Sequence, residues 1–206
     1  WARKAGWFYD GSYVKKETLY AEVERVLGRH PKLKVIFAHF YFLSADLRRA
    51  AVFLDAHPNV HLDLAPGWEL FYNMSRDPAA TRAFFVTYAD RILYGTDIAN
   101  TQTPAAARRL AADVLRWLAT RDVFRKEPGY GVLRGLGLPR SALAKILHGN
   151  FERIAGASPR VLRLDLARDE CERIAAETDA MLGGRARKNP ARQATKWLGK
   201  TGRAFR

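Results

Sequence analysis

Hydrophobic residues recur along the first third of the chain in two patterns, a helical stripe and a short continuous run. From Glu17 to Gly28 the apolar side chains fall at i, i+4, i+7 and i+8, which predicts an amphipathic helix; they are Leu19, Val23, Val26 and Leu27. Within the stretch from Leu33 to Phe42, residues 35–38 form a continuous apolar run that ends at His39. Continuous hydrophobicity is typical of a strand that is covered on both faces, as in a parallel sheet.

The two patterns alternate as far as Ile98. Helices are expected from Ser44, as N-cap, to Ala56 and from Asp77 to Tyr88. Strands are expected at residues 60–65 and within the stretch 91–98. Strands that alternate with helices predict βα units in a parallel sheet, so the expected fold class is α/β.

The second half of the chain shows helical signals on both sides of a glycine-rich stretch. Further helices are expected at residues 103–120, from Leu138 to about His148 with a continuation at 150–156, and at 166–182. Residues 121–138 are predicted to be irregular, and residues 185–206 to form a disordered or loosely attached tail. The expected organisation is a main domain over 1–156, a helical extension over 157–184 and a basic tail over 185–206.

Composition narrows the class of protein. Hydrophobic residues make up 48% of the 206 residues, enough to bury a core, so a disordered or fibrous protein is excluded. The single cysteine, Cys171, excludes an internal disulfide and favours a reducing compartment, with the cytoplasm as the expected location. No apolar run approaches the roughly 20 residues that span a bilayer, so no membrane partner is expected.

The formal net charge of +14 is concentrated near the C-terminus. Beyond residue 184 there is no acidic residue but there are eight basic ones: Arg185, Arg187, Lys188, Arg192, Lys196, Lys200, Arg203 and Arg206. Such a segment can bind nucleic-acid phosphates without reading their sequence, or simply keep a tail solvated. The solvated tail is the favoured interpretation, and a basic nucleic-acid-binding module is retained as an alternative function.

Polar, chemically active side chains come at or near the ends of three successive predicted strands. His39, Asp63 and Asp97 occupy these positions. The carboxyl ends of parallel strands meet at one edge, where the active sites of α/β barrels lie. Imidazole and carboxylate groups on such a rim suit a divalent metal, with zinc expected, because a zinc-bound water is acidic enough to act as a nucleophile.

Four segments resemble one known family. They are A-H-F at 38–40, H-P-N-V-H-L-D-L at 57–64, R-I-L-Y-G-T-D at 91–97 and N-F-E-R-I-A-G at 150–156. Together they look like the amidohydrolase-related branch of the amidohydrolase superfamily, over roughly residues 15 to 156. The resemblance implies a TIM barrel and a metal-dependent hydrolase, or a metal-dependent decarboxylase on the same scaffold.

The resemblance also implies roles for individual residues. Asp97 matches the carboxylate after the last barrel strand, which binds the metal or takes the proton of the attacking water. His39 matches the histidine that ends the sixth strand, which binds metal or polarises the substrate. The expected contacts to a small-molecule substrate are Asp63, Glu69, Asn73 and Phe40.

The sequence departs from the family pattern in two ways. The His-x-His pair of the first strand and the histidine of the fifth strand, all metal ligands in the family, have no counterpart here. Where many relatives have glycines after the strand-six histidine, this chain has Phe40, Tyr41 and Phe42. The first difference, with a chain that begins at Trp1, predicts a C-terminal fragment holding strands six to eight.

Such a fragment would leave its sheet edge before Val35 open. The expected partners are therefore the missing N-terminal part of the barrel, a small-molecule substrate and, as a further option, a second copy of the chain. An inactive gene fragment is the remaining alternative.

Overall fold

The computed structural model describes residues 3–4, 8–99, 101–127, 129, 131–158, 161–184 and 189–201. These residues form two compact units, unit 1 over Trp1–Ala157 and unit 2 over Ser158–Arg206, and each is described by itself. Within the described residues, no helix combines the length and the apolar character needed to cross a bilayer.

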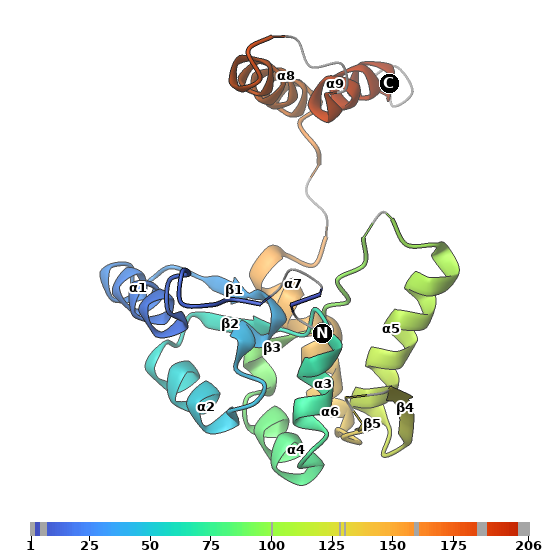
Figure 1. Cartoon of the computed structure of the whole chain (residues 1–206). Coiled ribbons are helices and arrows are strands. Elements are labelled where there is room, and N and C mark those ends of the chain that lie inside the picture. Colours follow the sequence, from blue (N-terminus) through green and yellow to red (C-terminus); the bar gives the residue numbers. More distant parts are fainter. Residues whose placement is uncertain are drawn as a thin grey trace. The chain divides into compact units, whose positions relative to one another are not determined.

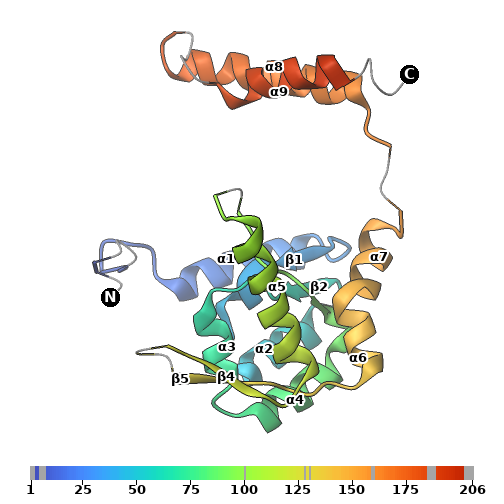
Figure 2. The same cartoon turned by 90° about the vertical axis from the view of Figure 1, so that its right-hand side faces the viewer.

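Unit 1 contains a three-stranded parallel sheet in the order β1-β2-β3 (Figures 1 and 2). The strands are β1 (Val35–Phe37), β2 (Val60–Asp63) and β3 (Ile92–Leu93). The helices that alternate with them are α1 (Lys16–Arg29), α2 (Leu47–Ala56), α3 (Trp68–Met74) and α4 (Pro78–Thr87). This alternation confirms the α/β class and the parallel sheet, although each strand is shorter than its predicted segment.

The sheet has two different faces. In parallel pairing, Val35 aligns with Val60 and Leu62 with Ile92, so these side chains share one face. On this core face Val60, Leu62 and Ile92 are at most 1% exposed. The second face carries Ile36, His61, Asp63 and Leu93. Ile36 is 39% exposed there, and among the described residues β1 pairs with β2 alone, so the outer edge of β1 is open.

Helix starts in unit 1 follow local capping chemistry. The side chain of Asp77 accepts a hydrogen bond from Ala80 N (2.9 Å) and begins α4, as predicted. The predicted cap Ser44 is replaced by Asp46, which accepts from Arg49 N (2.9 Å). Ser44 instead lies buried, where its hydroxyl accepts a hydrogen bond from Asn73.

Residues 121–138 are not irregular, as predicted, but contain a hairpin. After α5 (Pro104–Ala119), strands β4 (Val123–Glu127) and β5 (Gly131–Arg134) pair antiparallel with a bulge at Arg125, whose φ is 43°. The hairpin forms because Leu133 inserts into the core, where it is completely buried. The many glycines concealed this apolar anchor in the sequence.

A continuous helical segment closes unit 1, as predicted. It consists of α6 (Arg140–Ala144), a π-helical turn η3 (Lys145–Gly149) and α7 (Asn150–Ala155). The carbonyl of Ile146 in the π turn accepts a hydrogen bond from Tyr94 N (2.8 Å), just beyond β3. The amide of Asn150 donates to the carbonyls of Ala89 and Ile92, both at 2.7 Å. The segment therefore holds β3 at both ends.

Unit 2 is a helical hairpin of α8 (Leu164–Met181) and α9 (Pro190–Thr201). Helix α8 confirms the helix predicted over 166–182. The predicted disordered tail is corrected over 190–201, because Asn189 and Leu198 pack against α8 and are 4% and 8% exposed. The basic charge of the tail masked this helical spacing, and residues 185–188 and 202–206 lie outside the described residues.

Candidate active site

His39 lies just after β1, at the edge of the sheet where the three parallel strands end. Its main-chain N–H donates to Oδ1 of Asp63 (3.0 Å), and its ring Nδ1 lies 2.9 Å from the carbonyl oxygen of Ala65. A carbonyl oxygen can only accept, so Nδ1 carries a hydrogen, and the form of the ring with a single hydrogen has its lone pair on Nε2. The half-buried imidazole is thus oriented with Nε2 available for chemistry.

The turn that carries His39 is left-handed over four residues. His39, Phe40, Tyr41 and Phe42 have φ values of 53°, 55°, 53° and 55°. Side chains other than glycine rarely adopt this region, and each such residue costs about 1–2 kcal/mol. Tertiary packing must therefore hold the turn.

Phe40 supplies that packing, and its expected contact with a substrate remains a prediction. The ring is completely buried and stacks on Phe85, with a centroid separation of 5.9 Å and an interplanar angle of 5°. It also packs against Phe84 at 5.8 Å. The ring of Phe40 is therefore part of the core of unit 1.

Asp63 ends β2 and connects two strand exits. Its Oδ1 accepts hydrogen bonds from His39 N (3.0 Å) and from Ala65 N (2.9 Å). One oxygen of the Asp63 carboxylate is thus used to hold the main chain. The contact of Asp63 with a substrate remains a prediction.

Asp97 is expected at the tip of the third strand. Because β3 ends at Leu93, Asp97 lies four residues beyond the strand. Its side chain is exposed and its φ is 47°. Among the described residues, no hydrogen bond or ion pair engages the Asp97 carboxylate. The main chain between β3 and Asp97 packs closely against Ala65, because a Cβ added at Gly95 would lie only 2.8 Å from Ala65 N.

Ala65 is therefore where the three strand exits meet. It accepts from the His39 ring, donates to Asp63 and packs against Gly95. The backbones of β1 and β3 lie roughly 10 Å apart, because β2 separates them. Sequence reasoning missed Ala65, because the contribution is made by main-chain atoms and no side-chain signal marks it.

Glu69 and Asn73, which are predicted in the loop after β2, lie on helix α3, and their side chains make different contacts. Glu69 folds back over Gly67, where its Oε1 occupies the space 2.1 Å from a Cβ built on that glycine. The Asn73 amide instead donates to Ser44 Oγ at 3.1 Å.

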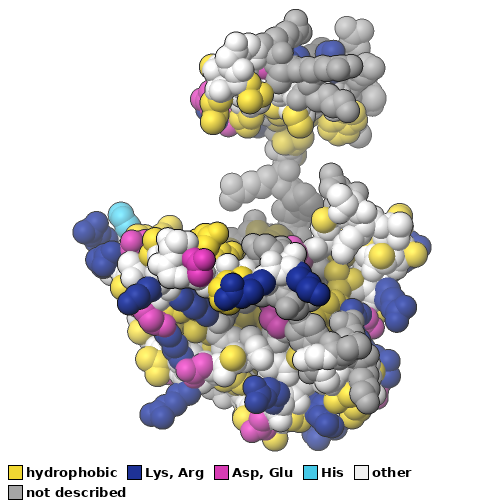
Figure 3. All heavy atoms as spheres, in the orientation of Figure 1, with side chains coloured by type: hydrophobic (Ala, Val, Ile, Leu, Met, Phe, Trp, Pro, Cys, Tyr) yellow, Lys and Arg dark blue, Asp and Glu magenta, His cyan; other side chains and the backbone are white. Residues whose placement is uncertain are grey.

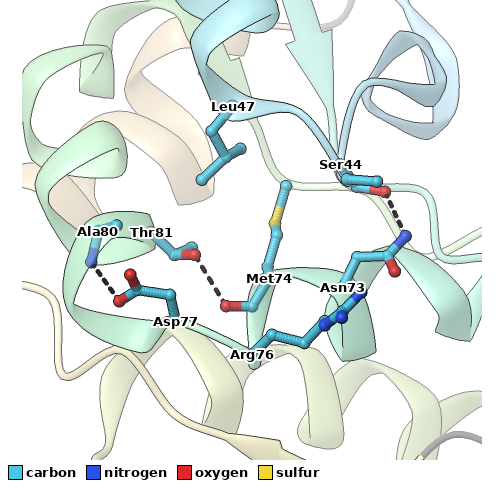
Figure 4. A pocket seen from close by; sticks show the side chains of 9 residues that line it. Ser44, Leu47, Asn73, Met74, Arg76, Asp77, Ala80 and Thr81 are labelled. Atoms are coloured by element: carbon cyan, nitrogen blue, oxygen red, sulfur yellow. Dashed lines mark hydrogen bonds between the residues drawn. The ribbon is translucent and has the colours of Figure 1, made fainter.

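Asn73 lines a cavity of about 210 Å³ between the starts of α2 and α4, together with Ser44, Ala45, Leu47, Met74, Arg76, Asp77, Ala80 and Thr81 (Figure 4). None of the strand-end residues His39, Asp63 and Asp97 lines it. Asn73 therefore lines a cavity that does not include the strand-end residues.

His61 occupies the second face of the sheet and is unusual electrostatically. The side chain is 7% exposed, and its buried Nδ1 has no hydrogen-bond partner among the described residues. Burial lowers the pKa of His61, and the positive charges of Arg91 and Arg153 lower it further. The ring is therefore a neutral, incompletely bonded group on the face opposite the main core.

The predicted metal site is not complete within the part of the chain that the structure describes. Within the described residues, no group of three or more His, Cys, Asp or Glu side chains is placed to hold a metal ion. The two expected ligand groups, Nε2 of His39 and the carboxylate of Asp97, make no hydrogen bond to the main chain within the described structure. Two donors do not make the three- or four-ligand set that zinc requires.

Comparison with known proteins gives one match. The family model described as amidohydrolase matches residues 2–157 of the 206 residues. Neither the curated proteins nor the solved structures contain a match to this chain.

Proposed function

This chain belongs to the amidohydrolase family, and from that premise we propose that it carries one side of the active site of a hydrolase acting on a small molecule with a carbonyl-like centre. The family supports a hydrolase or lyase type of chemistry and generally uses divalent metals. The narrower proposal concerns the residues His39 and Asp97 and the structure needed to complete their site.

The observation that carries the proposal is the contact of 2.9 Å between Nδ1 of His39 and the carbonyl oxygen of Ala65. The Nδ1–H donates in this contact, so the form of the ring with a single hydrogen has its lone pair on Nε2, at the strand-end edge. Histidines that bind metals or transfer protons are oriented in this way, because the second ring nitrogen sets which nitrogen reacts.

Asp97 supplies the proton acceptor in this proposal. Its exposed carboxylate takes a proton from water as the water oxygen forms a bond to the carbonyl-like carbon. The bond to the leaving group then breaks, and the leaving group receives the proton from Asp97. His39 holds the substrate or the reacting centre through Nε2.

The site requires further strands. Since the described residues do not provide a metal site, a divalent ion, with zinc as the proposed metal, needs additional ligands from outside them. The open edge of β1 and the exposed side chain of Ile36 lie where added barrel strands would pack. We infer that the remainder of a barrel covers this edge.

The test compares the chain 1–206 with a version extended before residue 1 by the sequence encoded there. Both are assayed with added zinc or manganese on a panel of amides, esters, lactones and aromatic carboxylic acids, recording hydrolysis products and CO2 separately. The proposal expects hydrolysis by the extended protein and its loss in His39→Gln and Asp97→Asn. The matched control His30→Gln changes an exposed histidine outside the site.

Three results would contradict the proposal. CO2 release without hydrolysis assigns the decarboxylase chemistry instead. Full activity of both site variants removes His39 and Asp97 from the mechanism. Equal hydrolysis by the chain 1–206 alone refutes the need for added strands.

A further inference from the structure

The helical hairpin of unit 2 has a very small interior. Helices α8 and α9 lie side by side in both views (Figures 1 and 2), and Figure 2 shows that they run in opposite directions. Asn189 at the start of α9 donates a hydrogen bond to the Ala175 carbonyl (3.1 Å), and Arg192 pairs with Asp179. In unit 2, the described residues that are buried are Ala175, Asn189 and Leu198. Two helices with so little shared core gain little stability from each other.

Large apolar side chains remain exposed on one side of this hairpin. Ile174 is 41% exposed, Met181 88% and Trp197 61%. Met181 lies seven residues, or two turns, after Ile174 and so extends the same side of α8. Hydrophobic side chains gather along one side of unit 2 in Figure 3.

The positions of these residues place them on the same side of the pair. Ile174 precedes the buried Ala175 by one residue, and Trp197 precedes the buried Leu198 by one residue. In two antiparallel helices, residues that precede an interface residue by one position project to the same side. Ile174, Met181 and Trp197 therefore form one apolar strip, named the hairpin strip below, across both helices.

Charge identifies the occupant that fits the strip. Helix α8 contains six acidic and two basic residues, whereas α9 contains three basic residues and no acidic one. A twofold axis through the strip brings α8 of one copy against α9 of the other, so opposite charges lie around an apolar centre. Four helices packed in this way form a bundle, the common solution for amphipathic helical hairpins.

We propose that the chain dimerises through the hairpin strip, with unit 2 of two copies forming an antiparallel four-helix bundle. A second copy buries Ile174, Met181 and Trp197 together. The residues of this interface belong to unit 2, whereas His39, Asp97 and β1 belong to unit 1.

Sedimentation of the full chain from low to high micromolar concentration tests the proposal. The wild type is expected to form dimers, and Met181→Glu to raise the dissociation constant by about tenfold or more, because it places an unpaired charge at the interface. The matched control is Ala176→Glu, which adds the same charge to an exposed position one residue after Ala175, on the other side of α8. Its dissociation constant is expected to remain that of the wild type.

Circular dichroism of each variant shows whether the helices persist. If Met181→Glu loses helical signal, Trp197→Gln on the other helix decides instead, with the same expected weakening. A wild type that stays monomeric overturns the proposal. So does a dimer that withstands both strip variants, which is the result expected if the open edge of β1 mediates association.

Discussion

Asp63 shows how one side chain can organise the end of a sheet. Its Oδ1 accepts from the main-chain amides of His39 and Ala65, at 3.0 and 2.9 Å. Hydrogen bonds to an ionised acceptor are stronger than those between neutral groups. The carboxylate therefore sets the position of His39, whether or not it also meets a substrate.

Removing this acceptor is expected to destabilise the protein. Asp63→Ala leaves two amides without their acceptor and should lower the free energy of unfolding by about 3 kcal/mol, as measured by urea denaturation. Asp63→Asn keeps an oxygen acceptor and should cost less than half as much. An Ala variant no less stable than Glu22→Ala, which removes an exposed carboxylate, would contradict this role.

His61 predicts how stability changes with pH. Burial first, then Arg91 and Arg153, lower its pKa in the folded protein below the unfolded value. In the window between the two values the unfolded chain binds the proton more readily, so stability falls as pH falls from about 6.5, the ordinary histidine value. The change in the free energy of unfolding that one such group causes cannot exceed about 1.4 kcal/mol per pH unit.

The measurement is urea unfolding of the wild type and His61→Leu between neutral and mildly acidic pH. The leucine variant should lose less stability on acidification, because it has no proton to bind. The control His30→Gln alters an exposed ring and should keep the slope of the wild type. If the free energy of unfolding falls equally steeply with pH in the wild type and in His61→Leu, protonation of His61 is not the cause of the pH dependence.

At the scale of elements, the left-handed turn after β1 combines strain with core packing. Phe42 has a φ of 55° but is 61% exposed, whereas Phe40 has the same φ and is completely buried. Strain is thus similar at the two positions while the compensating contacts differ. The burial of the Phe40 ring offsets the cost of its backbone conformation, whereas the largely exposed Phe42 ring offsets that cost only weakly.

Substitutions in this turn are expected to have opposite effects. Phe42→Gly relieves the unfavourable φ and should raise the free energy of unfolding by about 0.5–1 kcal/mol. Phe40→Ala should lower it by about 3–5 kcal/mol, because it removes a buried ring. Thermal and urea unfolding of both variants check the pair. Destabilisation by Phe42→Gly would show that the turn is not strained in solution.

At the scale of the whole molecule, the chain divides into two compact units. The core of unit 1 is formed by residues before 147, and the buried residues of unit 2 come from its own two helices. Separate cores indicate separate folding.

A chain that ends at Ala157 is therefore expected to keep the stability of unit 1. Its free energy of unfolding, measured with urea by the fluorescence of the buried Trp117, should match that of the full chain within about 0.5 kcal/mol. A larger loss would mean that α8 and α9 stabilise unit 1 directly. That result would also argue against a second copy as the occupant of the hairpin strip.

Local patterns predicted the elements whose signals are local. The cap of α4 at Asp77, the length of α8 and the strand–helix alternation follow from capping chemistry and hydrophobic period. The hairpin of β4 and β5 and helix α9 were missed, because glycines and basic charge outweighed a few apolar anchors. Those anchors, Leu133 and Leu198, act only once the core they join has formed.

The sequence by itself determined the order of strands and helices as far as β3 and the presence of His39, Asp63 and Asp97 at or beyond the ends of successive strands. Only the tertiary structure decided what these residues touch: the Ala65 carbonyl selects the tautomer of His39, and two amides engage Asp63. It also assigned Phe40 to the core and Asn73 to a separate cavity. The physical reason is that strand order follows from periodic side chains, whereas these contacts are made by main-chain atoms and packed rings brought together from distant parts of the chain.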